Sequence, residues 1–277
     1  MANKYSNNIN EGYSAYPYAN VVENTADMIV DACENLMRGN TKGWKATNQT
    51  NTEYAINIVM SLSKNVNVMV NVRFLFTERL NGTPKGFYDA TTDMIHVNLI
   101  PSTCKYEIIR DVLLHELTHK FDDMRFFGME DDNTTPYKYH YHGDIQNGFF
   151  PNSIKRLLYI LWDTHEFNAW QASVRQLKGG VKQLYSYIVE CEKINDPGIW
   201  AKVGEYLTNK QDKENDLWGG ESNKFNNRGP EWIKRYFIRV SKDRFEKFRK
   251  KYVRKQTRDF VNESIAIIET LINKNII

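Results

Sequence analysis

The five residues His115-Glu116-Leu117-Thr118-His119 constrain the fold more than any other segment of the chain. On a helix, residues four positions apart lie on the same face, so His115 and His119 would direct two imidazoles toward one point. Glu116 follows the first of them, where its carboxylate can reach a water held at that point. Two His ligands, an open coordination position and a neighbouring carboxylate are what a hydrolytic zinc site needs. The segment therefore predicts a helix that carries a metal site.

The flanking residues favour that helix. No Pro or Gly interrupts Lys105 to Phe121, and apolar residues recur at helical spacing: Ile108, Ile109, Val112, Leu113, Leu117 and Phe121. The alternative is a helix whose polar face carries two His by coincidence. A chance match to the pattern occurs about once in a hundred chains of this composition, so the helical context is what gives it weight.

A third ligand is expected, because catalytic zinc usually takes three protein ligands. A second helical segment downstream contains Glu166, with Ala169 three residues later. His165 is the rival of Glu166, and adjacent helical positions point about 100° apart, so only one of them can face the metal. The other interpretation of Glu166 is a solvated helix residue.

With these residues the chain resembles a zincin of the gluzincin type, a class of zinc metallopeptidase in which HExxH on one helix and a Glu on a second helix hold the ion. The resemblance implies Zn²⁺ as cofactor, with His115, His119 and Glu166 as its ligands. It implies Glu116 as the general base of peptide hydrolysis, and a peptide or protein as substrate. In that family a small residue such as Ala169 follows the Glu where the helices pack closely.

The chain departs from the best-known gluzincins in its spacing and its supporting residues. His119 and Glu166 lie 47 positions apart, so the segment between them must be an insertion. No Asp follows Glu166 where some of these enzymes keep a carboxylate that orients a metal ligand, and Asp122 or Asp123 would orient an imidazole instead.

No motif assigns the residue that stabilises the oxyanion. Tyr and His side chains are suitable donors, and the candidates for oxyanion or substrate contacts are Tyr139, His140, Tyr141, His142 and His165. The alternative for the insertion is an aromatic loop packed on the domain or on a partner.

The segments around the motif predict an α+β fold of the zincin-like class. Val or Phe occupies every second position of residues 66–76, and this period of two predicts a strand. Residues Met94–Leu99 predict another. In the family an edge strand lies just before the HExxH helix and commonly pairs with extended substrate, so residues 94–99 are expected at the edge. Helices are predicted at 21–37, 53–62, 182–194 and 199–207. The expectation is a small mixed sheet with an edge strand, the HExxH helix and a mainly helical C-terminal half.

The predicted organisation has four parts: an extended N-terminal arm at 1–20, a zincin-like domain at 21–208, a linker or loop at 209–230, and a basic amphipathic helical tail at 231–277. Between Lys234 and Arg258 the tail holds twelve Lys or Arg against two acidic residues. This basic face at 234–258 is either solvated or binds an anionic partner such as nucleic acid, a wall polymer or an acidic protein surface.

Composition limits the setting of the chain. Its three Cys are scattered and imply no disulfide framework, and its first residues lack the apolar run of a signal peptide. No stretch approaches the length of a membrane span. We therefore expect synthesis in the cytoplasm. The net charge of +3 is too small to argue for nucleic acid.

A second hypothesis comes from the many Asn, Lys, Ile and Tyr residues, which suggest an AT-rich coding genome as in many bacteriophages. The chain would then be a structural component of a phage virion, in a tail, ring or capsid assembly. Its zincin-like fold would have vestigial or entry-related activity. The N-terminal arm, the basic tail and the aromatic insertion would be its contacts with other virion proteins.

Overall fold

The computed structural model describes residues 19–39, 45–46, 53–64, 66–77, 85–100, 105–126, 150–173, 180–218, 225, 227–249 and 265–275. The chain divides into two compact units. The first comprises Met1–Tyr139, Asn168–Lys178 and Lys251–Ile277, and the second comprises His140–Phe167 and Gly179–Lys250. The first unit holds a sheet and helices, whereas the described secondary-structure elements of the second are all helices. The fold is therefore α+β, as the sequence predicts.

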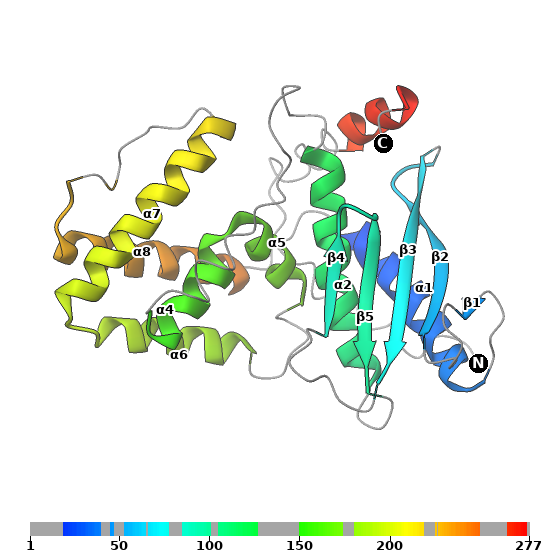
Figure 1. The fold of residues 1–277 in the computed structure, drawn as a ribbon, viewed down its shortest axis with the longest axis horizontal. Coiled ribbons are helices and arrows are strands. Elements are labelled where there is room, and N and C mark those ends of the chain that lie inside the picture. Colours follow the sequence, from blue (N-terminus) through cyan, green and yellow to red (C-terminus); the bar gives the residue numbers. More distant parts are fainter. Residues whose placement is uncertain are drawn as a thin grey trace. The chain divides into compact units, whose positions relative to one another are not determined.

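The described strands of the first unit form one sheet in the order β1-β2-β3-β5-β4 (Figure 1). Their bounds are β1 Lys45–Ala46, β2 Glu53–Ser61, β3 Asn67–Phe76, β4 Gly86–Asp89 and β5 Met94–Leu99. β3 and β5 are parallel, and the other neighbouring pairs are antiparallel. The sheet is mixed, and the strands predicted at 66–76 and 94–99 are confirmed.

The position of β5 differs from the prediction. β5 lies between β3 and β4, so β4 is the edge strand and the expectation that 94–99 forms the edge is wrong. β4 pairs antiparallel with β5, and this pairing puts Tyr88 opposite Ile95.

The helix predicted at 53–62 is also wrong, because these residues form β2. Tyr54, Ile56, Ile58 and Met60 share one face of the strand, which is period two, but Ala55 and Val59 on the other face obscure the alternation in the sequence. Nine register pairs with β3, such as Ile56 with Val72, decide the conformation.

Helices α1 (Ala19–Met37) and α2 (Tyr106–Phe126) cover one face of this sheet (Figure 1). The core is made of fully or almost fully buried apolar residues from both helices and the central strands, including Ala26, Ile29, Val30, Val70, Val72, Phe74, Ile95, Val97, Leu113, Leu114 and Leu117. α1 ends where Gly39 takes a φ of 84°, a left-handed conformation that glycine adopts without strain. The helices predicted at 21–37 and 105–121 are confirmed.

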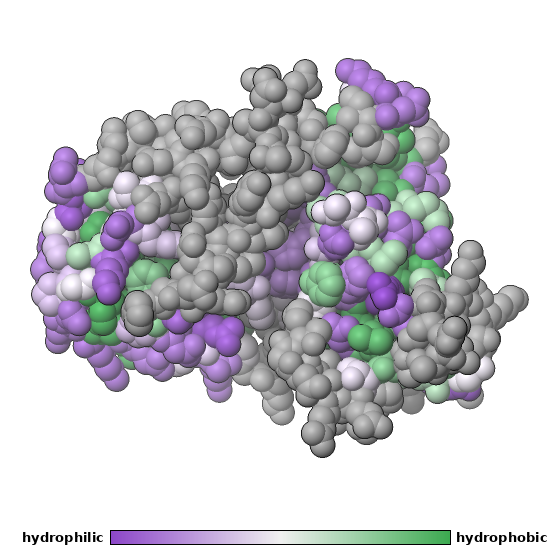
Figure 2. Space-filling view, in the orientation of Figure 1, coloured by the Kyte–Doolittle hydropathy of each residue, from purple (hydrophilic) through white to green (hydrophobic). Residues whose placement is uncertain are grey.

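The other face of the sheet points away from these helices and mixes polar with apolar residues (Figure 2). Val59, Met69 and Phe87 are 40–48% exposed there. His96 stacks on Phe87 with ring centroids 4.4 Å apart. A sheet with one face in the core and one mixed face explains the alternation that identifies β3 from the sequence.

The second unit packs its helices around a separate aromatic core. Its elements are α4 Asn152–Leu157, the π-helix η3 Leu158–Trp162, α6 Gly180–Glu192, α7 Pro197–Trp218 and α8 Pro230–Arg249. Trp162 stacks on Phe237 at 5.0 Å and donates to the Ser241 hydroxyl at 3.0 Å. Helix α5 (Thr164–Ser173) is one continuous helix whose first residues are grouped with the second unit and whose later residues are grouped with the first.

The structure changes the bounds of two of the four predicted parts, the linker and the tail. α7 continues to Trp218, so the linker predicted at 209–230 begins inside a helix. The tail predicted at 231–277 is divided: α8 belongs to the second unit, whereas residues 265–273 form a helix whose Ile268 is buried in the core of the first. Residues 1–18 of the N-terminal arm lie outside the described residues, and the virion hypothesis stays a prediction.

α8 has the amphipathic character expected of the basic segment. Ile233, Phe237 and Phe245 are buried, and Arg235 and Arg239 are exposed. This distribution agrees with a basic outer face on a packed helix. The anionic partner of residues 234–258 stays a prediction.

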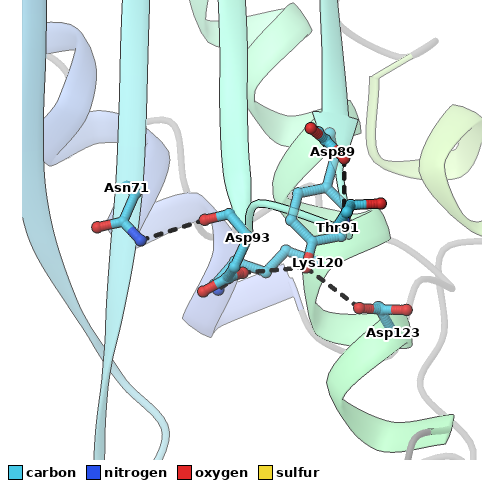
Figure 3. A network of polar contacts seen from close by, with 7 residues as sticks. Asn71, Asp89, Thr91, Asp93, Lys120 and Asp123 are labelled. Carbon is cyan, nitrogen blue, oxygen red and sulfur yellow. Dashed lines mark hydrogen bonds and ion pairs between the residues drawn. The ribbon is translucent and has the colours of Figure 1, made fainter.

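An ion pair connects the β4–β5 turn to α2. The Lys120 ammonium on α2 is 2% exposed and pairs with the Asp93 carboxylate, which is 49% exposed (Figure 3). Asp93 has a φ of 49°, a conformation that Asp and Asn tolerate better than most residues. An ammonium so deeply buried is costly unless it is paired, so Asp93 stabilises this part of α2.

Two further contacts complete this network. The Tyr88 hydroxyl on β4 lies 3.0 Å from Asp93 and 3.2 Å from Asp123 on α2. Burial, followed by the charges of Asp123 and Asp93, raises the pKa of the Tyr88 phenol above its ordinary value. The Asn71 amide on β3 donates to the Asp93 carbonyl at 3.2 Å (Figure 3). The edge of the sheet is thereby tied to the helix that carries HExxH.

Asp93→Asn tests the contribution of this ion pair. The variant keeps a residue that tolerates positive φ but removes the carboxylate opposite the buried ammonium, so we expect the free energy of unfolding to fall by about 2–3 kcal/mol in urea titrations. Glu205→Gln, at an exposed carboxylate on α7, is the control. A loss no larger than that of the control would contradict the assigned role.

Candidate metal centre

α2 brings the two imidazoles of the motif to one point. The Nε2 atoms of His115 and His119 lie 3.2 Å apart, and both residues are half-buried. In a tetrahedral zinc site, two nitrogens each at about 2.0–2.1 Å from the ion lie about 3.3 Å from each other. The pair thus has the spacing of two ligands of one ion.

The start of α5 is fixed by Asp163. This residue has φ −84° and ψ 126°, an extended conformation that ends the π-helix η3. Its Oδ1 accepts a hydrogen bond of 3.0 Å from the Glu166 backbone N–H, which is an N-terminal cap. The cap places Glu166 in the first turn of α5 and determines the direction of its side chain.

Asp163 and Glu166 have the spacing of a capping box, in which the Glu carboxylate accepts from the N–H of the capping residue. Here that N–H is already donated to the Leu158 carbonyl at 3.1 Å. Capping therefore does not require the Glu166 carboxylate. Glu166 is only 3% exposed, so the interpretation of a solvated helix residue is wrong.

The later turns of α5 hold the first imidazole. The Nδ1 atom of His115 lies 3.4 Å from the Ser173 hydroxyl, which donates at 3.2 Å to the Ala169 carbonyl. Because that hydroxyl proton is used, Ser173 can accept from an Nδ1–H of His115, and this tautomer has the unprotonated Nε2 that a metal ligand needs. Trp170 contacts the same imidazole edge to face at 5.1 Å.

Glu166 completes the group. One potential ligand atom from each of His115, His119 and Glu166 lies within 4.8 Å of the other two, so the group could hold a metal ion. Glu166 shares its helix with Trp170 and Ser173, and their contacts with His115 set the placement of α5 on α2. Two imidazoles and one carboxylate are a donor set of catalytic zinc sites, so these residues fit that ion.

Glu116 lies under the edge strand. Its side chain is 6% exposed. A Cβ added at Gly86, the first residue of β4, would lie 2.3 Å from Val112 Cγ1 and 3.3 Å from Glu116 Oε1. Only a residue without a side chain allows β4 to approach α2 this closely. Gly86 thus brings the sheet edge to the expected general base.

The remaining predicted site residues have different outcomes. Tyr139, His140, Tyr141 and His142 lie outside the described residues, as does the side chain of His165. Of the two predicted partners of an imidazole, Asp123 contacts the Tyr88 hydroxyl and Asp122 is fully buried. Their orienting role stays a prediction.

Sequence reasoning missed Ser173 and Asp111. Ser173 lies seven residues after Glu166, two turns along the same face of a helix, and this spacing is the signal that could have found it. Asp111 lies one turn before His115, at the same spacing as His115 and His119. Its side chain is 8% exposed, and burial raises the pKa of its carboxyl to about 7 although the nearby His115 opposes the rise.

Comparisons of the chain with models of known protein families, with curated proteins and with solved structures give no match. In the described part of the chain, no helix has the length and apolar character to cross a membrane.

Glu166→Ala tests the third ligand. We expect the affinity for Zn²⁺, measured by competition with a chromophoric chelator, to fall about 100-fold or more because one of three protein ligands is lost. His165→Ala is the matched control, since it changes the neighbouring position on the same helix and should leave the affinity unchanged. The reverse result would make His165 the ligand.

Gly86→Ala tests the close approach of β4. Val112 has little rotamer freedom on a helix, so we expect the added methyl to lower the free energy of unfolding by about 1–3 kcal/mol. The double variant Gly86→Ala/Val112→Ala removes the clashing methyl and should lose less stability than the sum of the single variants. Additive losses in urea titrations would show that the two residues do not meet.

Proposed function

We propose that the chain is a zinc-dependent peptidase that hydrolyses peptide bonds, with Glu116 as general base. The observation that carries this proposal is the convergence of His115, His119 and Glu166 within 4.8 Å, on two helices, beside a buried Glu116. A pair of His at helical spacing occurs in other settings. A buried carboxylate brought to them by a separate helix favours a metal centre.

Each residue of the site would have a separate role in the reaction. A zinc ion held by His115, His119 and Glu166 would polarise a carbonyl and lower the pKa of water toward about 7. The Glu116 carboxylate accepts the proton of the attacking water and passes it to the departing amine nitrogen. Ser173 keeps the His115 proton on Nδ1, so the Nε2 lone pair stays available. The burial of Glu116 strengthens its interaction with the charge that develops in the reaction.

β4 supports a peptide as the substrate. The Lys85 carbonyl accepts from the Asn98 N–H at 2.8 Å. In an antiparallel pair every second residue forms such hydrogen bonds, so Lys85 and Phe87 direct their backbone N–H and C=O groups toward β5. The N–H and C=O groups of Gly86 and Tyr88 therefore point to the other side, where no described strand pairs with β4. An extended peptide pairing there would run past Glu116.

Glu116→Gln tests the mechanism. The variant keeps the size of the side chain but cannot accept a proton, so we expect unchanged zinc binding and a loss of hydrolysis of about 10³-fold. The measurement is zinc content together with digestion of a peptide mixture followed by mass spectrometry. Glu205→Gln, at an exposed carboxylate on α7, should cleave like the unchanged chain. Undiminished turnover in Glu116→Gln would exclude Glu116 as the base.

A further inference from the structure

The Asp111 carboxylate is a buried charge-bearing group without a partner. The residue is 8% exposed, and its Oδ1 is buried with no hydrogen-bond partner. The Asp111 side chain forms neither a hydrogen bond nor an ion pair with the residues that the structure describes. Most buried polar atoms in proteins are satisfied, so an unsatisfied carboxylate beside a candidate active site calls for a functional explanation.

Asp111 lies where β4 meets the metal-binding face of α2. It is four residues before His115, which puts it on the same helical face and about 6 Å further along the axis. Its carboxylate interacts electrostatically with His115, with Lys85, the residue before β4, and with the neighbouring Arg110. One residue further along both segments, a Cβ added at Gly86 would contact Val112 and Glu116. Asp111 thus lies at the same strand–helix junction as the proposed general base.

Two structural roles do not account for it. α2 begins at Tyr106, so Asp111 lies past the first four N–H groups and does not cap the helix. Asp111 is also not part of the group that could hold a metal ion among the described residues. A single carboxylate does not form a divalent-cation site, which takes several oxygen ligands.

We propose that Asp111 binds a cationic group of the substrate, either the α-ammonium of a peptide or the side chain of Lys or Arg. This inference rests on the proposed peptidase function and names its substrate class. A buried carboxylate gains a charge-assisted hydrogen bond from such a group, which satisfies the unpartnered oxygen. A distance of about 6 Å along α2 corresponds to about two residues of an extended strand. The cation would therefore belong to a residue within about two positions of the cleaved bond.

The first experiment measures charge preference in the zinc-loaded chain. Digestion of a peptide mixture locates the cleaved bonds, and matched peptides then carry either Lys or the uncharged norleucine at each nearby position. A second pair has a free or an acetylated N-terminus, which separates a side-chain cation from an α-ammonium. We expect kcat/KM to be about 10- to 100-fold higher for one cationic member than for its neutral match.

Asp111→Asn is the decisive variant. It should reduce that preference to near unity while kcat/KM for the neutral peptide and zinc content stay unchanged. Glu107→Gln is the matched control, because Glu107 is an exposed carboxylate one turn earlier on the same helix and should keep the preference. A purely structural role of Asp111 would instead lower the rates for cationic and neutral peptides equally.

A binding measurement separates this inference from the proposed function. In the Glu116→Gln background, the Kd of the same peptides should show the same preference and lose it when Asp111→Asn is added. If the unchanged, zinc-loaded chain cleaves no peptide, the proposed function fails and binding alone decides on Asp111. Cleavage without charge preference, or a preference that survives Asp111→Asn, would overturn the inference and leave the peptidase intact. If Asp111→Asn does not fold, the peptide series on the unchanged chain decides.

Discussion

Leu113, Leu114 and Leu117 bury one face of α2 against the sheet and α1, and this packing sets the direction of every other side chain on the helix. Because helical positions are locked to one another in rotation, fixing these leucines also fixes His115 and His119. The core of the first unit is thus also the support of the candidate site. A displacement of α2 relative to the sheet would disturb the core and would move both imidazoles relative to β4.

The same helix carries charged groups at positions where most helices bury apolar ones. Lys120, Glu116 and Asp122 are each at most 6% exposed, which is costly unless a partner or ion compensates. Asp93 compensates Lys120 from the sheet. At the metal centre the proposed ion would offset the desolvation of a different carboxylate, that of Glu166 on α5. If the proposed ion binds, it would therefore also add to the stability of the chain.

What could be predicted from the sequence was set by local periodicity. The helix around His115, the strand β3 and the position of Glu166 all follow from patterns within one element. β2 was mistaken for a helix because apolar residues lie on both of its faces, and only pairing with β3 decides between the two. The role of Ser173 at His115, and the pairing of Lys120 with Asp93, join residues far apart in the chain. No pattern in the sequence specifies such contacts, because they depend on how completed elements pack.

The short edge strand has a consequence for the association of the chain with other proteins. An edge strand that accepts a substrate is also a template for unwanted pairing with a neighbouring molecule, which leads to aggregation. β4 spans four residues, with the exposed Lys85 before it and Asp89 at its end. A single extended peptide can pair with the outward-facing backbone groups of Gly86 and Tyr88. The longer strand of a second protein would extend past them and place its own backbone beside the charges of Lys85 and Asp89. The geometry that would admit substrate thus also limits self-association.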